Sequence, residues 1–106
     1  MKQLYIFLLA AFSLTAFASG ITATGKIDHM YVNNEWSMVH LTGVQSNPDN
    51  CQSTAYYAIR PGEKNYEVLH STLLAAHLSG KSVKFWVNGC GGQNNQYPRI
   101  VSVWMY

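Results

Sequence analysis

Charged residues are scarce in this chain: Lys, Arg, Asp and Glu together make up 11% of its 106 residues. Residues 19–106 carry six basic and five acidic side chains, a net charge of +1. Nucleic-acid-binding proteins present a concentrated basic surface, because phosphate contacts supply much of their affinity. The low, balanced charge argues against a nucleic-acid partner and favours a surface that recognises neutral polar ligands or other proteins.

Long apolar runs are also lacking, except at the N-terminus. There a positive Lys2 precedes an apolar stretch that ends with the small residues Ala16 and Ala18, the plan of a secretory signal. We predict cleavage after Ala18, so that residues 1–18 are the signal peptide and residues 19–106 form a single domain. The apolar stretch is short for a membrane span, which disfavours the alternative of a stable membrane anchor. The predicted location is therefore secreted, in the periplasm or outside the cell.

Only two cysteines are present, Cys51 and Cys90. An even number of cysteines in an exported protein predicts a disulfide, with two free thiols or half of a metal site as the alternative. In the chain-entropy model, a bridge that closes a loop of this length stabilises a domain by about 4 kcal/mol. Such a bridge also removes the only thiols that could serve as a nucleophile.

Metal-binding motifs are missing, since the chain has no HxH, HExxH or CxxC spacing. Its four histidines are spread over two predicted strands and the predicted helix: His29, His40, His70 and His77. We interpret them as surface or rim residues, with His77 near the helix edge, and we predict no metal and no cofactor.

Catalytic constellations are missing too. The five acidic residues are scattered among turns and strands, and the one acid–base neighbourhood is Asp28-His29 with Glu35 across the first hairpin. Neighbouring residues on a strand point to opposite faces, so Asp28 and His29 are not expected to act together. The sequence therefore predicts a protein that is not an enzyme.

What is present is a mainly β pattern with one helix. Alternating apolar and polar residues between turn signals predict five strands, and one segment with a period near 3.6 predicts a helix. The predicted strands cover residues 25–32, 36–41, 52–59, 82–87 and 99–105, and the helix covers residues 65–79. The order β-β-β-α-β-β favours a five-stranded OB-fold Greek-key barrel whose helix closes one end. A small open α+β sheet is the alternative.

The pattern also predicts which side chains face inward. Tyr66, Leu69, Leu73 and Ala76 form one helical stripe, widened by Val68, Leu74 and Leu78. Asn65 is placed as the N-cap of the helix and Gly80 as the residue that ends it. In the first strand, strict alternation groups Ile27, His29 and Tyr31 on one face.

Two loops suggest a ligand site, because OB-folds commonly recognise oligonucleotides or oligosaccharides with the loops after their first and fourth strands. Here these loops are residues 33–36 and 88–98, and the second is rich in glycine and amides. Amides offer both a donor and an acceptor to sugar hydroxyls, and aromatic rings cover apolar sugar faces. The candidate ligand-binding residues are Trp36, Gln93, Asn94, Asn95 and Tyr97. The alternative is a solvated turn pinned by Cys90.

Aromatic residues are more numerous than a small core can enclose. The chain has three Trp and seven Tyr, and Trp86 and Trp104 are predicted on strand faces opposite the aliphatic ones. Because Trp and Tyr are favoured in protein interfaces, these faces suggest a contact between subunits, with simple shielding of the strands as the alternative.

One region resembles a known family. The helix end LLAAHLSGK, residues 73–81, and the strand SVKFWV, residues 82–87, are similar to the receptor-binding B subunits of the subtilase cytotoxin and pertussis-like bacterial toxin group. The resemblance implies a signal peptide, an OB-fold and a ring-forming, usually pentameric subunit. It further implies binding to cell-surface glycans, often sialylated, and a separately encoded catalytic A subunit. The chain is shorter than those subunits, and the resemblance assigns no sugar-binding residue.

Together these observations predict a secreted binding module that recognises a cell-surface glycan or glycoprotein and forms homo-oligomers. The alternative is a solitary secreted protein-interaction or inhibitory domain without toxin activity.

Overall fold

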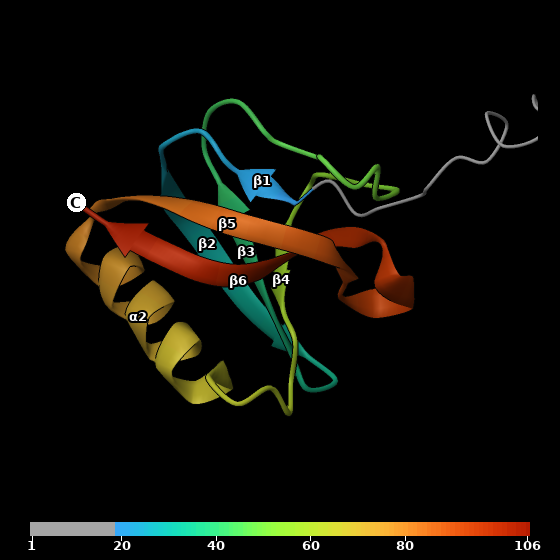
Figure 1. Ribbon diagram of the computed structural model, residues 1–106. Coiled ribbons are helices and arrows are strands. Elements are labelled where there is room, and N and C mark those ends of the chain that lie inside the picture. Colours follow the sequence, from blue (N-terminus) through green and yellow to red (C-terminus); the bar gives the residue numbers. More distant parts are fainter. Residues whose placement is uncertain (1–18) are drawn as a thin grey trace, which may run out of the picture.

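The computed structural model describes residues 19–106, so the predicted signal peptide, residues 1–18, lies outside the described residues. The described chain is mainly β, with six strands and one α-helix (Figure 1). The elements are β1 (Gly20–Ile21), β2 (Gly25–Asn33), β3 (Trp36–Leu41), β4 (Tyr57–Ile59), α2 (Tyr66–Ser79), β5 (Ser82–Gly91), the short 3₁₀ helix η2 (Gln93–Asn95) and β6 (Tyr97–Met105).

Five of the strands pair in a closed cycle. Antiparallel pairings join β2 to β3, β3 to β4, β5 to β6 and β5 back to β2, and a parallel pairing of Ala58 with Arg99 joins β4 to β6. The sheet is therefore folded on itself, with β5 and β6 crossing the other strands (Figure 1). The short β1 adds to the edge of β5.

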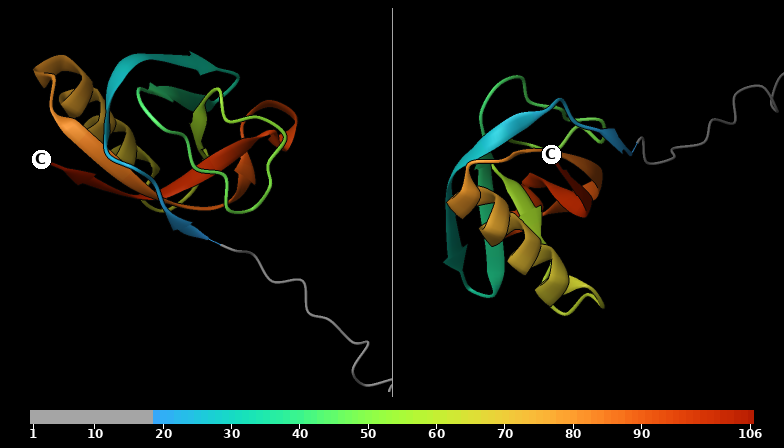
Figure 2. Two further views of the ribbon diagram at one scale, coloured as in Figure 1. Left: turned by 90° about the horizontal axis from the view of Figure 1, so that it is seen from above. Right: turned by 90° about the vertical axis from the view of Figure 1, so that its left-hand side faces the viewer.

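The core fills the inside of this cycle and the space beneath α2. Its largest fully buried side chains include Tyr57, Phe85 and Leu73, and the Tyr57 and Phe85 rings meet edge to face at 5.3 Å. Burial raises the pKa of Tyr57, although a hydrogen bond from the Ser46 backbone opposes the shift. In Figures 1 and 2, α2 lies at the opposite end of the molecule from the turn that contains η2.

The helix matches its sequence pattern closely. Leu73 and Ala76 are buried, and Tyr66 and Leu69 pack against the core, which confirms the predicted stripe. Gly80 adopts a left-handed conformation (φ 70°) and its N–H bonds the last helical carbonyls, as predicted for a terminal glycine. Asn65 stands at the N-cap position, but its side chain makes no capping hydrogen bond. Val68, Leu74 and Leu78 were predicted to widen this apolar stripe. All three are exposed, so the buried stripe is narrower than predicted.

Several predicted boundaries were wrong. The third strand was expected over residues 52–59, but only Tyr57–Ile59 pairs, and residues 51–56 are irregular. The loop expected over residues 88–98 is shorter, because β5 continues to Gly91 and β6 begins at Tyr97. The pairing of Gly20 and Ile21 with β5 was not predicted, since two residues are too few to show a pattern.

Strict alternation fails in β2 because of a β-bulge. Ile27 pairs with Leu41 and His29 with His40, so Asp28 is an extra residue on its strand. A bulge shifts the side-chain alternation by one position. Ile27 therefore faces the core together with Met30, while His29 and Tyr31 lie on the outer face, contrary to the predicted grouping.

Candidate functional site

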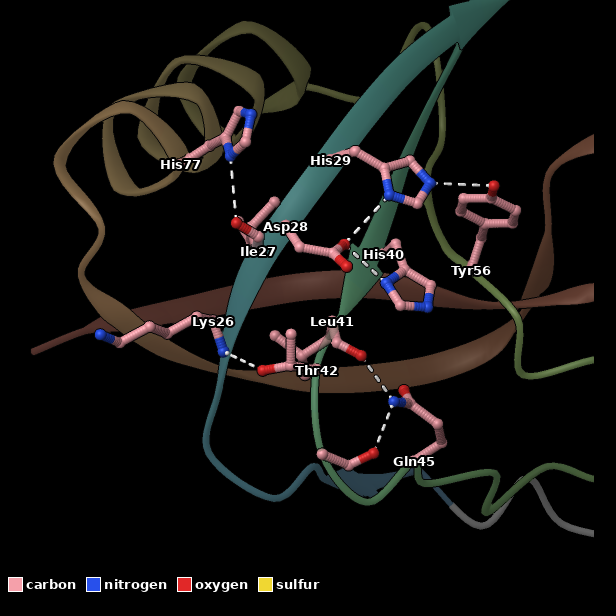
Figure 3. Close-up of polar contacts among 11 residues, drawn as sticks. Lys26, Ile27, Asp28, His29, His40, Leu41, Thr42, Gln45, Tyr56 and His77 are labelled. Carbon is pink, nitrogen blue, oxygen red and sulfur yellow. Dashed lines mark hydrogen bonds and ion pairs between the residues drawn. The ribbon is translucent and has the colours of Figure 1, made fainter.

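The β2–β3 hairpin brings three ionisable side chains together. Its turn places Asn34 and Glu35 at positive φ, 54° and 81°, and this tight connection sets His29 opposite His40. The bulge turns Asp28 to the same side as His29 (Figure 3). The expectation that Asp28 and His29 point apart was therefore wrong, because it assumed an unbroken strand.

We call Asp28, His29 and His40 the Asp–His cluster. Oδ1 of Asp28 lies 2.6 Å from Nδ1 of His40 and 3.0 Å from Nδ1 of His29. The two imidazole rings are nearly parallel, with centroids 4.9 Å apart. The hydrogen bond with His40 has the largest effect and lowers the pKa of Asp28. Desolvation opposes it, and the charges of both imidazoles lower the pKa further.

The cluster continues into a group of three tyrosines. Nε2 of His29 lies 3.0 Å from the Tyr56 hydroxyl (Figure 3). The Tyr56 ring in turn meets Tyr31 at 5.1 Å and Tyr97 at 6.0 Å, both edge to face. Edge-to-face contacts place the positive edge of one ring on the negative face of another, which fixes the relative ring orientations. We call Tyr31, Tyr56 and Tyr97 the tyrosine cluster.

Gln93 belongs to the same surface. Partial burial raises the pKa of Tyr31, and the neighbouring Tyr97 and Tyr56 raise it further, while a side-chain hydrogen bond with Gln93 acts in the opposite direction. This bond lowers the pKa because the Tyr31 oxygen accepts it, so Nε2 of Gln93 is the donor; apart from this bond, that buried nitrogen has no partner within residues 19–106. The surface thus combines aromatic rings with a half-buried amide side chain.

The irregular segments that carry this surface are tied together covalently and by hydrogen bonds. The predicted disulfide is confirmed: Cys51 is bonded to Cys90, with a Cα–Cα distance of 5.7 Å. The Ser53 backbone donates to the Gln96 carbonyl at 2.9 Å, and the Gly89 backbone donates to Asp49 Oδ2 at 2.6 Å. These bonds hold the segment that bears Tyr56 against the start of β6.

The predicted ligand-binding residues lie around this surface but differ in their surroundings. Tyr97 belongs to the tyrosine cluster, and Gln93 hydrogen-bonds Tyr31 of the same cluster. The structure therefore brings these two predicted residues to one surface. Asn94 and Asn95 are exposed and hold positive φ values of 58° and 53°. Asparagine tolerates this conformation, so the backbone conformation alone is enough to explain an asparagine at each of these positions. Trp36 lies so close to Gly91, the residue paired with Tyr97, that a Cβ atom at Gly91 would come within 2.9 Å of the Trp36 ring.

The other two histidines form structural bonds. His70 lies 2.8 Å from the buried Ser37 hydroxyl, which also bonds Tyr66. His77 donates to the Ile27 carbonyl at 3.0 Å and is half-buried, as expected for a residue at the helix edge. Neither joins the Asp–His cluster.

The sequence did not predict that the Asp–His cluster lies beside Tyr31 and Tyr56. A two-residue turn at Asn34-Glu35 pairs His29 with His40 in the hairpin register, so that part was readable from the sequence. The bulge at Asp28 has no marker in the residue pattern. The approach of Tyr56 depends on contacts between segments distant in sequence, such as the bond between Ser53 and Gln96.

No protein-family model, curated protein or solved structure matches this chain. The resemblance to toxin B subunits therefore rests on the sequence pattern alone. Within residues 19–106, no helix is long and apolar enough to cross a membrane.

Proposed function

We propose that this protein is a secreted OB-fold domain that binds cell-surface glycans through the tyrosine cluster and Gln93. The closed cycle of pairings, with its single parallel contact between β4 and β6, supports the OB-fold assignment. Counted from β2, the second and third strands and the loop between the fourth and fifth strands are where OB-folds bind oligosaccharides. The predicted signal peptide and the disulfide support secretion.

The observation that carries this proposal is the contact of three half-buried tyrosine rings beside the amide side chain of Gln93. Apolar sugar faces pack on aromatic rings, and hydroxyls pair with amide donors and acceptors. The rings are held by the disulfide and by neighbouring bonds, so little conformational entropy is lost when a ligand binds.

An array of neutral and sialylated glycans tests the proposal, with the oxidised protein as the probe. We expect Tyr56→Ala and Gln93→Ala each to reduce binding by about tenfold, which corresponds to about 1.4 kcal/mol. The double variant Asn94→Gly/Asn95→Gly removes both amides but keeps the positive φ values, so it separates sugar contact from loop shape. Undiminished binding by Tyr56→Ala would refute the proposed surface.

A second candidate function is a protein-interaction or inhibitory domain. Its support is an exposed apolar strip on β1, β5 and the C-terminal end, where Ile21, Trp86, Trp104 and Tyr106 are 46%, 37%, 42% and 56% exposed. Ile21 pairs with Trp86, and the Lys84 ammonium lies over the rings of Trp104 and Tyr106, so these residues share one face. Trp and Tyr are enriched at the centres of protein interfaces.

Light scattering after size-exclusion chromatography tests whether this strip joins subunits, and it serves as a control for the glycan proposal. If the strip joins subunits, as in a pentameric ring, wild type is an oligomer and Trp104→Ala dissociates it. A monomeric wild type counts against self-association. Trp104→Ala should leave the glycan affinity of a single subunit unchanged, because Trp104 lies outside the tyrosine cluster.

A further inference from the structure

We propose that the Asp–His cluster is a binding site for a divalent transition-metal ion such as Zn²⁺. Asp28, His29 and His40 each present one donor atom, and the three atoms lie within 4.8 Å of one another. Two imidazole nitrogens with one carboxylate oxygen are a donor set that Zn²⁺ accepts. This inference does not depend on the proposed glycan function.

The distances suit a tetrahedral ion. Bonds of about 2.0–2.1 Å from Zn²⁺ to nitrogen and oxygen place neighbouring ligand atoms roughly 3.3 Å apart. Oδ1 of Asp28 now lies 2.6 Å from Nδ1 of His40 and 3.0 Å from Nδ1 of His29. An imidazole nitrogen binds a metal in the plane of its ring, so at least one of the two nearly parallel rings turns out of the stack when both coordinate one ion. The ion then replaces the ring protons that now face the carboxylate.

The strands hold the ligands in place. His29 and His40 are directly opposed in the β2–β3 pairing, and the bulge turns Asp28 between them. Both Nδ1 atoms face the same carboxylate oxygen. Because the site is built on paired strands, the ion need not order a loop when it binds.

Tyr56 supplies the outer support that metal-binding histidines usually have. Its hydroxyl lies 3.0 Å from Nε2 of His29, the ring nitrogen that faces away from Asp28. When Nδ1 of His29 binds a metal, Nε2 carries the proton and donates to the Tyr56 oxygen, which fixes the ring orientation. A hydroxyl both donates and accepts, so this bond is kept in the free and loaded states.

The site is open to solvent, and folding stability does not account for its arrangement. The side chains of His29, Asp28 and His40 are 50%, 48% and 35% exposed, so an ion has free entry and at least one coordination position remains for water or ligand. Exposed ion pairs of this kind contribute little to stability. A juxtaposition of three metal-ligating groups on a bulge is better explained by a ligand that they share.

Isothermal titration calorimetry with ZnCl₂ tests the site. The sample is the protein as purified from the cells that express it, with no histidine tag. We expect one Zn²⁺ per chain, and at least a tenfold loss of affinity in Asp28→Asn and in His40→Gln. Tyr56→Phe should lose about tenfold, in line with removal of an outer hydrogen bond. His77→Gln, which removes a histidine from the helix edge, should bind as wild type does.

No heat of binding in wild type, or unchanged affinity in the double variant Asp28→Asn/His40→Gln, would overturn the proposal. If a variant does not fold, Co²⁺ added to wild type decides the question by NMR. The imidazole signals of His29 and His40 should then broaden or shift much more than those of His70 and His77, because paramagnetic effects fall steeply with distance from the ion. Equal effects on all four histidines would contradict a specific site.

Discussion

The helix side and the tyrosine side of this molecule are built by different means. On the helix side, α2 packs on the core through a regular stripe that includes Leu73 and Ala76, and Gly80 ends it. On the tyrosine side, the candidate functional residues come from the bulge in β2, the irregular residues 51–56 and the short loop after β5. The Cys51–Cys90 disulfide ties the second of these to the end of β5. Periodic sequence thus forms the scaffold of this fold, while local irregularity and cross-links form its surface chemistry.

This difference has a physical origin. A buried helical stripe needs only apolar residues at the right spacing, because burial of apolar area is not directional. A polar surface needs atoms at set distances and angles, and here tertiary bonds such as Cys51–Cys90 supply them.

Loss of the disulfide should have the largest effect. The double variant Cys51→Ser/Cys90→Ser removes a bridge across a separation of 39 residues, so the free energy of unfolding should fall by about 4 kcal/mol. Urea unfolding measures this fall. Because the bridge holds the segment of Tyr56, the near-ultraviolet tyrosine signal of the native state should also change. A loss below about 1 kcal/mol would contradict the proposed role of the bridge.

Leu73→Ala is the matched change on the helix side. Leu73 is fully buried, so its truncation leaves a cavity and should cost about 2–5 kcal/mol. The same urea experiment applies, but the environment of the tyrosine cluster and any glycan affinity should stay as in wild type. If Leu73→Ala disturbs the tyrosines as much as loss of the disulfide does, the two sides are not independent.

Substitutions at the two ends of α2 should differ in how much they lower the stability of the fold. Gly80 holds φ 70°, so Gly80→Ala should cost about 1 kcal/mol, because a Cβ atom is strained in that conformation. The Asn65 side chain makes no capping bond, so Asn65→Ala should cost less than about 0.5 kcal/mol, below the usual range for an N-cap. Thermal unfolding of both variants decides this, and equal losses would disprove the difference.

The smallest expected effect is the pH dependence of Asp28. Its hydrogen bond with His40 holds its pKa below the ordinary 3.8, so the carboxylate stabilises the folded state above that pH. This contribution disappears as the pH falls through the lowered folded-state pKa. Asp28→Asn should therefore be less stable than wild type near neutral pH and equal to it in strong acid. A stability difference that is the same at every pH would contradict this account.

Much of the scaffold could be predicted from the sequence, because it depends on periodicity and turn residues. The helix, the β3 bounds Trp36–Leu41 and the disulfide were all predicted, and Gly80 marked the helix end. The third strand was overestimated because Tyr and Thr favour strands, whereas residues 51–56 bond other segments, as Ser53 does with Gln96, instead of a strand partner.

The candidate site was only partly predictable. Tyr97 and Gln93 were predicted as ligand-binding residues because an amide-rich loop with an aromatic residue is visible in the sequence, and both lie at the tyrosine cluster. Asn94 and Asn95 belong to the same pattern, but their positive φ values already explain why asparagine occupies these positions. Tyr56 and the Asp–His cluster depend on the bulge at Asp28 and on tertiary contacts, which single-sequence patterns do not report.

The central claim is that the tyrosine cluster and the loop that bears Gln93 contact a glycan. Amide chemical-shift mapping of the ¹⁵N-labelled protein, titrated with the best glycan from the array, tests it most directly. We predict that the shifts concentrate at Tyr31, Tyr56 and the 92–97 segment. Shifts centred on Trp86 and Trp104 instead, or no saturable shifts at all, would contradict the account.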